Sequence, residues 1–225
     1  MFKTILLDLD DTILDFGAAE RVAIAKTFRQ IGLEPTDRLI DRYSEINISQ
    51  WEAFERGEIS RDTVLTRRFD LLFEELGVSF DSHSCEDMYR GYLGIGHYFV
   101  DGAIELLDYL APKYDLYIAS NGVAATQNTR LASANISHYF KAIFISETTG
   151  HHKPEKEYFD YCFARIEDFD PAKTIIIGDS LTSDIRGGIN AGITTCWFNP
   201  KRKPQRADIV PNFEIHALSE LKNLL

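Results

Sequence analysis

The chain has 225 residues, of which 44% are hydrophobic, and its formal net charge is −11 at pH 7. This size suits one α/β domain, or a core with a smaller second domain, and the acidic balance disfavours a nucleic-acid polymer as a partner, because that partner requires a broad basic surface. No apolar run reaches the roughly 18 residues of a membrane span, and the apolar stretch near the N-terminus is too short for a signal peptide, so we expect a soluble cytoplasmic protein.

Five short segments rich in Ile, Val, Leu and Phe predict buried strands. In chain order they are residues 4–9, 116–120, 142–146, 174–178 and 194–198. Helical patterns at residues 124–135, 156–166 and 183–191 alternate with the last four strands. Such alternation predicts a parallel sheet with helices on both faces, so we expect an α/β fold with a Rossmann-like core.

The interval between the first two predicted strands departs from this alternation. It contains helical patterns and no convincing strand, and a structureless loop of that length is improbable. The helical patterns cover residues 18–30, 38–48, 61–76 and 85–92. We therefore expect an all-helical cap domain inserted after the first strand, with residues 1–14 and 100–225 forming the core and residues 15–99 the cap.

Polar clusters follow four of the predicted strands. They are Asp8 and Asp10, then Ser120, Asn121 and Gly122, then Lys153, and finally Asp179 with Asp184. In open parallel sheets, ligands bind at the carboxyl ends of the strands. We therefore expect these side chains to surround one ligand at one edge of the sheet.

The three acids Asp8, Asp10 and Asp179 offer hard oxygen ligands, which Mg²⁺ prefers together with waters and a substrate phosphate. A cation would also offset the repulsion between neighbouring carboxylates. Asp11 is expected to face away, because one turn cannot aim three nearby acids at one small ion. The Ser120 hydroxyl and the amides of Asn121 and Gly122 can donate hydrogen bonds to phosphoryl oxygens.

The remaining groups suggest phosphoryl transfer. Lys153 supplies positive charge that stabilises a transition state. Of the two acids Asp8 and Asp10, one can attack phosphorus and form an aspartyl phosphate, and the other can protonate the leaving oxygen and then activate water.

The set Asp8-x-Asp10-x-Thr12, Ser120, Lys153 and Gly178-Asp179-x-x-x-x-Asp184 resembles the haloacid dehalogenase superfamily of phosphohydrolases, and the helical insertion is similar to its C1-type cap. The resemblance implies specific roles for these residues. Asp8 would be the nucleophile, Asp10 the general acid/base with its carbonyl on Mg²⁺, Ser120 and Lys153 phosphate ligands, Asp179 a metal ligand, and Thr12 and Asp184 supporting residues. The carbon–halogen branch lacks the second acid, so Asp10 argues against dehalogenation.

Four stretches resemble the pyrimidine 5′-nucleotidases of this superfamily: residues 120–122, 145–150, 184–192 and 196–199. This resemblance implies a magnesium-dependent phosphomonoesterase that hydrolyses nucleoside 5′-monophosphates, with pyrimidines preferred. A sugar-phosphate or phosphoglycolate-type phosphatase, a phosphomutase and a non-catalytic phosphate-binding regulator remain as alternatives. In each case the partner is a small phosphorylated metabolite.

Aromatic and histidine side chains leave further questions open. Trp51 and Phe54 could stack on a nucleobase or form the interior of the cap. His151 and His152 adjoin Lys153 and could contact substrate or metal. The physiological substrate, the cap residues that contact it and the oligomeric state are not determined by the sequence.

Overall fold

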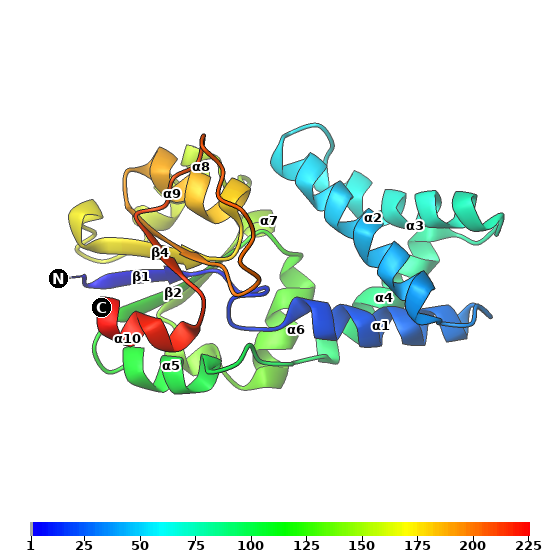
Figure 1. Cartoon of the computed structure of the whole chain (residues 1–225), viewed down its shortest axis with the longest axis horizontal. Helices are drawn as coiled ribbons and strands as arrows, with labels where there is room; N and C mark the ends of the chain where they lie inside the picture. The colour runs from blue at the N-terminus through cyan, green and yellow to red at the C-terminus, as the bar shows by residue number, and fades with distance from the viewer. Residues whose placement is uncertain (1) are drawn as a thin grey trace. The chain divides into compact units, whose positions relative to one another are not determined.

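The computed structural model describes residues 2–225 (Figure 1). The chain forms two compact units. The core unit comprises the residues up to Phe16 together with His97–Leu225, and the helical unit comprises Gly17–Gly96. None of the helices between residues 2 and 225 has both the length and the apolar character needed to cross a bilayer.

The core unit contains a six-stranded sheet in the order β3-β2-β1-β4-β5-β6, and all five strand pairs are parallel. The strands are β1 (Thr4–Leu7), β2 (Asp115–Ser120), β3 (Ala142–Ile145), β4 (Thr174–Gly178), β5 (Thr194–Phe198) and β6 (Phe213–Ile215). Leu7 pairs with Ile118 of β2 and with Ile177 of β4, so these three strands end close to one another. The residue after β1 therefore lies near the middle of the carboxyl edge of the sheet.

Helices cover both faces of this sheet, with α5 and α10 on one side and α8 and α9 on the other (Figure 1). The bounds are α5 (Ala103–Leu110), α6 (Ala124–Ala134), α7 (Ser146–Thr149), α8 (Lys156–Phe163), α9 (Arg186–Ala191) and α10 (Leu221–Leu224). Side chains alternate along a strand. Ile5 and Leu7 accordingly pack in the cluster that contains α5, whereas Leu6 packs with Phe159 of α8. The predicted α/β fold with a parallel sheet is confirmed.

The helical unit is built from four helices, α1 (Phe16–Gln30), α2 (Asp37–Glu55), α3 (Arg61–Leu76) and α4 (Ser82–Ile95). Side chains of Thr36, Ser60 and Asp81 accept backbone hydrogen bonds at the starts of α2, α3 and α4. Such N-caps satisfy amides that have no partner within the helix. Tyr43 lies at the centre of the interior, with its ring 5.2 Å from that of Phe69 and 5.6 Å from that of Tyr89.

Three elements show the most informative differences from the prediction. Helix α2 continues to Glu55, well past the predicted residue 48, because Gln50, Ala53 and Phe54 extend its buried face. Phe54 is 6% exposed and Trp51 packs edge-on against it with ring centroids 5.8 Å apart. The predicted helix at 183–191 begins as a π-helical turn, Leu181–Ile185. Strand β6 was not predicted from the sequence, because three residues carry too little pattern.

Candidate active site

Asp8 directly follows the central strand β1, and the sheet continues to hold its backbone, because its amide donates to the carbonyl of Ile177 at 2.9 Å. The residue is 7% exposed. Its Oδ1 accepts a hydrogen bond from Lys153 Nζ at 2.7 Å, and its Oδ2 accepts one from Thr12 Oγ1 at 3.3 Å. Both carboxylate oxygens are thus oriented by neighbours, and the supporting role of Thr12 stays a prediction.

Lys153 is brought beside Asp8 by the segment that follows β3 and α7, and its side chain is 1% exposed. Its ammonium group donates to Asp8 Oδ1 at 2.7 Å, to Asp184 Oδ1 at 2.7 Å and to the carbonyl of Ala119 at 2.6 Å. All three ammonium donors are therefore in use. Burial alone would lower the pKa of Lys153, but Asp184 and Asp8 outweigh it and raise that pKa, so the side chain is charged.

Asp184 lies in the π-helical turn after β4 and is 1% exposed. Its Oδ2 accepts a hydrogen bond from the amide of Ser180 at 3.1 Å. A Cβ atom at residue 178 would lie 2.2 Å from Asp184 Cγ, so the glycine there lets this carboxylate approach the strand end. π-Helical turns are frequent at functional sites, and this one directs a carboxylate toward Lys153.

A cluster of three acids forms around this point. Single carboxylate oxygens of Asp8, Asp179 and Asp184 all lie within 4.8 Å of one another. Burial raises the pKa of Asp179 to about 8, with Asp184 and Asp11 adding to the shift and Lys203 opposing it. Burial also raises the pKa of Asp8, against the opposing effect of Lys153. The hard oxygen donors of this cluster fit Mg²⁺, and a cation there would offset the repulsion between the carboxylates.

The Asp10 side chain lies outside this cluster. Its Oδ2 accepts a hydrogen bond from Gln127 Nε2 at 2.5 Å, and its Oδ1 is paired with Arg130 Nη1. The carboxylates that gather are thus those of Asp8, Asp179 and Asp184, and Asp10 is held toward helix α6. This arrangement separates the second acid of the opening motif from the acids that could hold a metal.

Ser120 at the end of β2 and the two residues that follow it have distinct surroundings. Ser120 Oγ accepts hydrogen bonds from the Gly122 amide at 3.1 Å and from Gln127 Nε2 at 2.9 Å. The Asn121 side chain donates to the Lys153 carbonyl at 2.8 Å and accepts from the Lys153 amide at 2.9 Å. Asn121 therefore fixes the backbone of Lys153, and the Gly122 amide, expected to bind phosphate, is directed at Ser120.

The two histidines before Lys153 face a different partner. The Nδ1 atoms of His151 and His152 lie 3.5 and 3.1 Å from the Glu155 carboxylate. The structure thus places these imidazole nitrogens against Glu155. Neither histidine belongs to the group of acids that could share a metal ion within the described residues 2–225.

The family model of haloacid dehalogenase-like hydrolases matches residues 2–192. The chain belongs to this family. Putative HAD-hydrolase YfnB from Bacillus subtilis is 46% identical, and the alignment covers 100% of this chain and 95% of that protein. Pyrimidine 5′-nucleotidase PynA from Streptococcus pneumoniae is 37% identical over 100% of this chain and 95% of its own length, and pyrimidine 5′-nucleotidase YjjG from Escherichia coli is 29% identical over 98% and 96%.

Among solved structures, that of YfnB bound to magnesium superposes on this haloacid dehalogenase-like hydrolase with a TM-score of 0.96, covering 100% of this chain and 98% of the other. L-2-haloacid dehalogenase from Xanthobacter autotrophicus has a TM-score of 0.78 at 17% identity, with coverage of 100% and 98%. This second likeness concerns the fold alone. The predicted membership of the superfamily is confirmed.

Sequence reasoning missed two residues of this hydrolase, Gln127 and Arg130. They lie on helix α6, which starts shortly after Ser120, and both are buried. Their spacing of three places them on one helix face. A glutamine and an arginine on a helix normally indicate a solvated face, so only their position directly after a predicted site loop could have drawn attention to them.

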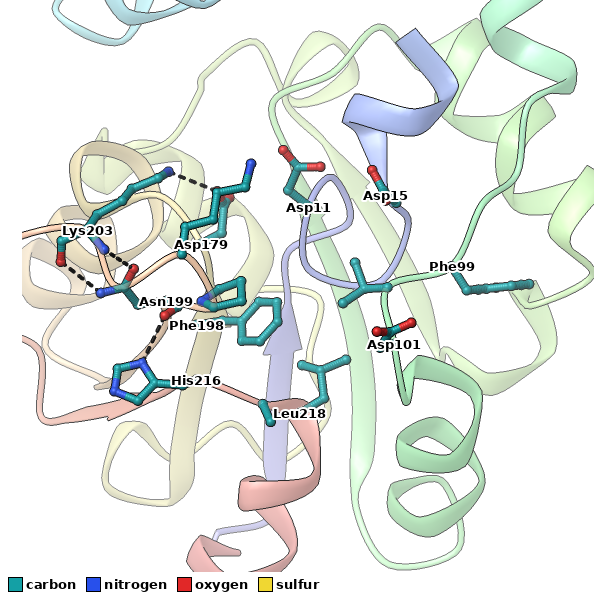
Figure 2. Close-up of a pocket in the computed structure, with 14 residues that line it drawn as sticks. Asp11, Asp15, Phe99, Asp101, Asp179, Phe198, Asn199, Lys203, His216 and Leu218 are labelled. Atoms are coloured by element: carbon teal, nitrogen blue, oxygen red, sulfur yellow. Dashed lines mark hydrogen bonds and ion pairs between the residues drawn. The ribbon is translucent and has the colours of Figure 1, made fainter. Parts of the chain in front are cut away.

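A cavity of about 410 Å³ adjoins Asp179 in the core unit (Figure 2). Asp11, Asp15 and Asp101 lie on one side of it, and Lys203 and His216 on the other. Lys203 Nζ is 3.9 Å from Asp179 Oδ2. Asp11 adds to the negative potential at Asp179 and accepts a hydrogen bond from the Phe16 amide at 2.9 Å. Asp11 is not part of the cluster of three acids, but it lines the same cavity as Asp179, so the expectation that it faces away from the metal stays a prediction.

Proposed function

We propose that this hydrolase is a magnesium-dependent phosphomonoesterase in which Asp8 is the nucleophile. The observation that supports this most is the placement of Asp8, which is ion-paired to Lys153 and lies within 4.8 Å of two further carboxylates. Such a group is oriented, desolvated and close to a cation site, as an attacking carboxylate must be. A phosphate-binding regulator would have no use for this arrangement.

The residues of the acid cluster fit a divalent cation. Asp8, Asp179 and Asp184 would hold it, with the Asp10 carbonyl as a further ligand that the family resemblance implies. When bound, Mg²⁺ supplies positive charge that lets a phosphate dianion approach the Asp8 carboxylate. The burial of Asp8 and Asp179 supports this assignment, because burial disfavours their charged forms and a bound cation would offset that cost.

The proposed chemistry takes two steps on this chain's own residues. An oxygen of Asp8 forms a bond to phosphorus as the bond from phosphorus to the leaving oxygen breaks, and Asp10 gives its proton to that oxygen. Asp10 then takes a proton from water, whose oxygen attacks phosphorus and releases Asp8. Ser120 donates to a phosphoryl oxygen, and Lys153 stabilises the added charge through its contact with Asp8.

For the substrate we propose nucleoside 5′-monophosphates, with pyrimidine nucleotides preferred. Support comes from the two nucleotidases named above, which align with this chain over nearly its whole length, including residues 17–96. We assign to the helical unit the role of the cap that selects the substrate, since the chemistry of the core is common to many phosphate esters. A sugar-phosphate phosphatase is the principal alternative.

The test is phosphate release from a panel of UMP, CMP, AMP, glucose 6-phosphate and phosphoglycolate, each with Mg²⁺ and with EDTA. We expect turnover of the pyrimidine nucleotides in Mg²⁺ alone. Asp8→Asn should lower kcat by about a thousandfold or more, because it removes the nucleophile. Equal rates in Mg²⁺ and EDTA would refute the metal assignment, and preferred hydrolysis of glucose 6-phosphate would refute the nucleotide assignment.

The covalent intermediate has its own test. Acid quenching during turnover should trap one phosphoryl group on the peptide that contains Asp8, detected by mass spectrometry. The same peptide from the Asp8→Asn variant serves as the control and should stay unmodified. An active wild-type enzyme whose Asp8 peptide never carries phosphate, under conditions that trap other aspartyl phosphates, would point to direct attack by water.

A further inference from the structure

Helix α6 links two parts of the proposed active site through a continuous hydrogen-bond network. Gln127 Nε2 donates both to Asp10 Oδ2 at 2.5 Å and to Ser120 Oγ at 2.9 Å. Arg130 Nη1 pairs with Asp10 Oδ1 and donates to Gln127 Oε1 at 3.1 Å. Both oxygens of Asp10 are therefore held from one helix, and the same glutamine reaches the serine that ends β2.

Arg130 is present at an energetic cost. Its side chain is 1% exposed, and its Nε and Nη2 atoms have no hydrogen-bond partner within the described residues 2–225. Its guanidinium also lies 5.7 Å from the centre of the Phe16 ring. A buried cation with unsatisfied donors contributes little to stability. An arginine in such a place points to a role other than stabilisation. The charged group that it contacts is the Asp10 carboxylate.

The contacts of Ser120 restrict what its hydroxyl can do. A hydroxyl group has two acceptor lone pairs and one proton to donate. Both acceptor positions of Ser120 are used, one by the Gly122 amide and one by Gln127. The proton is therefore left to donate to a further acceptor. The room for Gln127 comes from residue 122, where a Cβ atom would lie 2.4 Å from Gln127 Nε2.

We propose that Gln127 and Arg130 are positioning residues for phosphoryl transfer: Arg130 and Gln127 together fix the orientation of the Asp10 carboxylate, and Gln127 makes Ser120 an obligate hydrogen-bond donor. This inference rests on the proposed function, because Asp10 and Ser120 act on a phosphate ester there. Neither residue touches the substrate. Each acts through another side chain, and small errors of orientation at a reacting group reduce rates strongly.

The first test compares steady-state kinetics of Arg130→Met and Gln127→Met with a matched control, Thr126→Val. Thr126 is buried on the same helix and lies outside the network, and valine has its shape. We expect kcat to fall by about ten- to a hundredfold in both variants, a part of the effect of a general acid. KM should rise in Gln127→Met alone, because only this variant disturbs Ser120. Wild-type kcat in both methionine variants would overturn the proposal.

The second test asks whether the residues act through Asp10. Arg130→Met is introduced into the wild type and into the Asp10→Asn variant. All four proteins are assayed on an aryl phosphate, whose leaving group needs little protonation. If Arg130 works by orienting Asp10, its replacement should cause almost no further loss of kcat in the Asp10→Asn background. A loss as large as that in the wild-type background would overturn the positioning role, because it would show that Arg130 acts independently.

Two further variants keep the test decisive where Arg130→Met does not fold. Arg130→Lys retains the charge but not the planar group and should recover part of kcat. Gly122→Ala leaves the sequence of α6 unchanged, but its added methyl group displaces the Gln127 side chain. It should therefore reproduce the kinetic effect of Gln127→Met. Unchanged kinetics would count against the proposal. Absence of phosphate release by the wild-type enzyme from every monoester is a different result, because it refutes the proposed function itself.

Discussion

Lys153 and Asp8 form a 2.7 Å ion pair although 145 positions separate them in the chain. The same ammonium group also reaches Asp184, so one cation serves two buried carboxylates. Its geometry uses every donor that lysine has. The pair therefore fixes the spatial relation between the end of β1 and the segments after β3 and β4, which together form the proposed catalytic centre.

Lys153→Met should destabilise the protein as well as abolish phosphate release. Removal of one partner of a buried pair leaves an uncompensated charge and costs about 3–5 kcal/mol. Urea unfolding followed by circular dichroism measures this loss. The loss should shrink as the pH falls, because burial raises the pKa of Asp8 and protonation of this carboxyl group removes an unpaired charge. Lys153→Arg is the control that keeps the charge, and an unchanged urea midpoint for Lys153→Met would contradict the ion-pair network.

The metal-free protein should lose stability as the pH rises. Burial raises the pKa of Asp179 from 3.8 to about 8. A group whose pKa is higher in the folded state binds its proton more tightly there, so its stabilising contribution is complete below the unfolded pKa and is lost as the pH rises through about 8. In EDTA, the Tm should therefore decline across this range. Asp179→Asn should show a flatter dependence, and an equal slope in both proteins would exclude Asp179 as its source.

Magnesium should reverse that decline. A cation that binds ionised carboxylates of the folded protein stabilises it by mass action, and it competes with the protons that these groups hold at low pH. The rise in Tm on adding Mg²⁺ should thus be larger near pH 8 than near pH 5. We expect no comparable rise in Asp179→Asn. Identical shifts in the variant and the wild type would place the ion elsewhere.

Gly178→Ala tests the close approach at the end of β4. The added methyl group would lie 2.2 Å from Asp184 Cγ, so Asp184 must move and its contact with Lys153 must weaken. Overpacking of this kind costs about 1–3 kcal/mol, and activity should fall with it. Gly91→Ala is the matched control, because a Cβ there meets nothing within 4 Å. In helix α4, that change should raise stability by about 0.5–1 kcal/mol and leave activity unchanged.

A buried ion pair in the helical unit offers a prediction away from the active site. Arg68 pairs with Glu86 and donates to Asn47 Oδ1 at 2.7 Å, and all three side chains are buried. Arg68→Met should lower stability by about 3–5 kcal/mol, because Glu86 loses its buried partner and keeps only Arg90, whose Nε lies 3.4 Å from Glu86 Oε1. The double variant Arg68→Met with Glu86→Leu should recover most of that loss. If the double variant is no more stable than the single one, packing rather than charge governs this site.

The strands of the core were predictable because of their surroundings. Thr174–Gly178 and Thr194–Phe198 have the predicted bounds, since a central parallel strand buried on both faces is apolar almost throughout. The edge strand β6 was missed. It has three residues, of which Phe213 is 39% exposed, and its pairing with β5 depends on tertiary contacts that leave no local pattern.

The sequence predicts which residues gather at the site better than it predicts the directions of their side chains. Strand order brought Asp8, Asp179 and Asp184 to one edge, as the sequence predicts, but the sequence prediction grouped Asp10 rather than Asp184 with the metal ligands. Which way the Asp10 carboxylate turns depends on Gln127 and Arg130, over a hundred positions away. Their burial comes from the packing of α6 within the core unit, and a helix pattern read alone assigns such polar residues to solvent.

The central position of β1 also bears on synthesis of the protein. This strand precedes the other strands of the sheet in the chain, yet one of its neighbours is β2, at Asp115–Ser120, and the other is β4, at Thr174–Gly178. The nascent chain therefore holds an apolar strand with an open edge until β4 has been translated, and pairings between such distant segments form slowly. We infer that the proposed nucleophile acquires its surroundings late in translation, so a chain ending before β4 would have no partial activity.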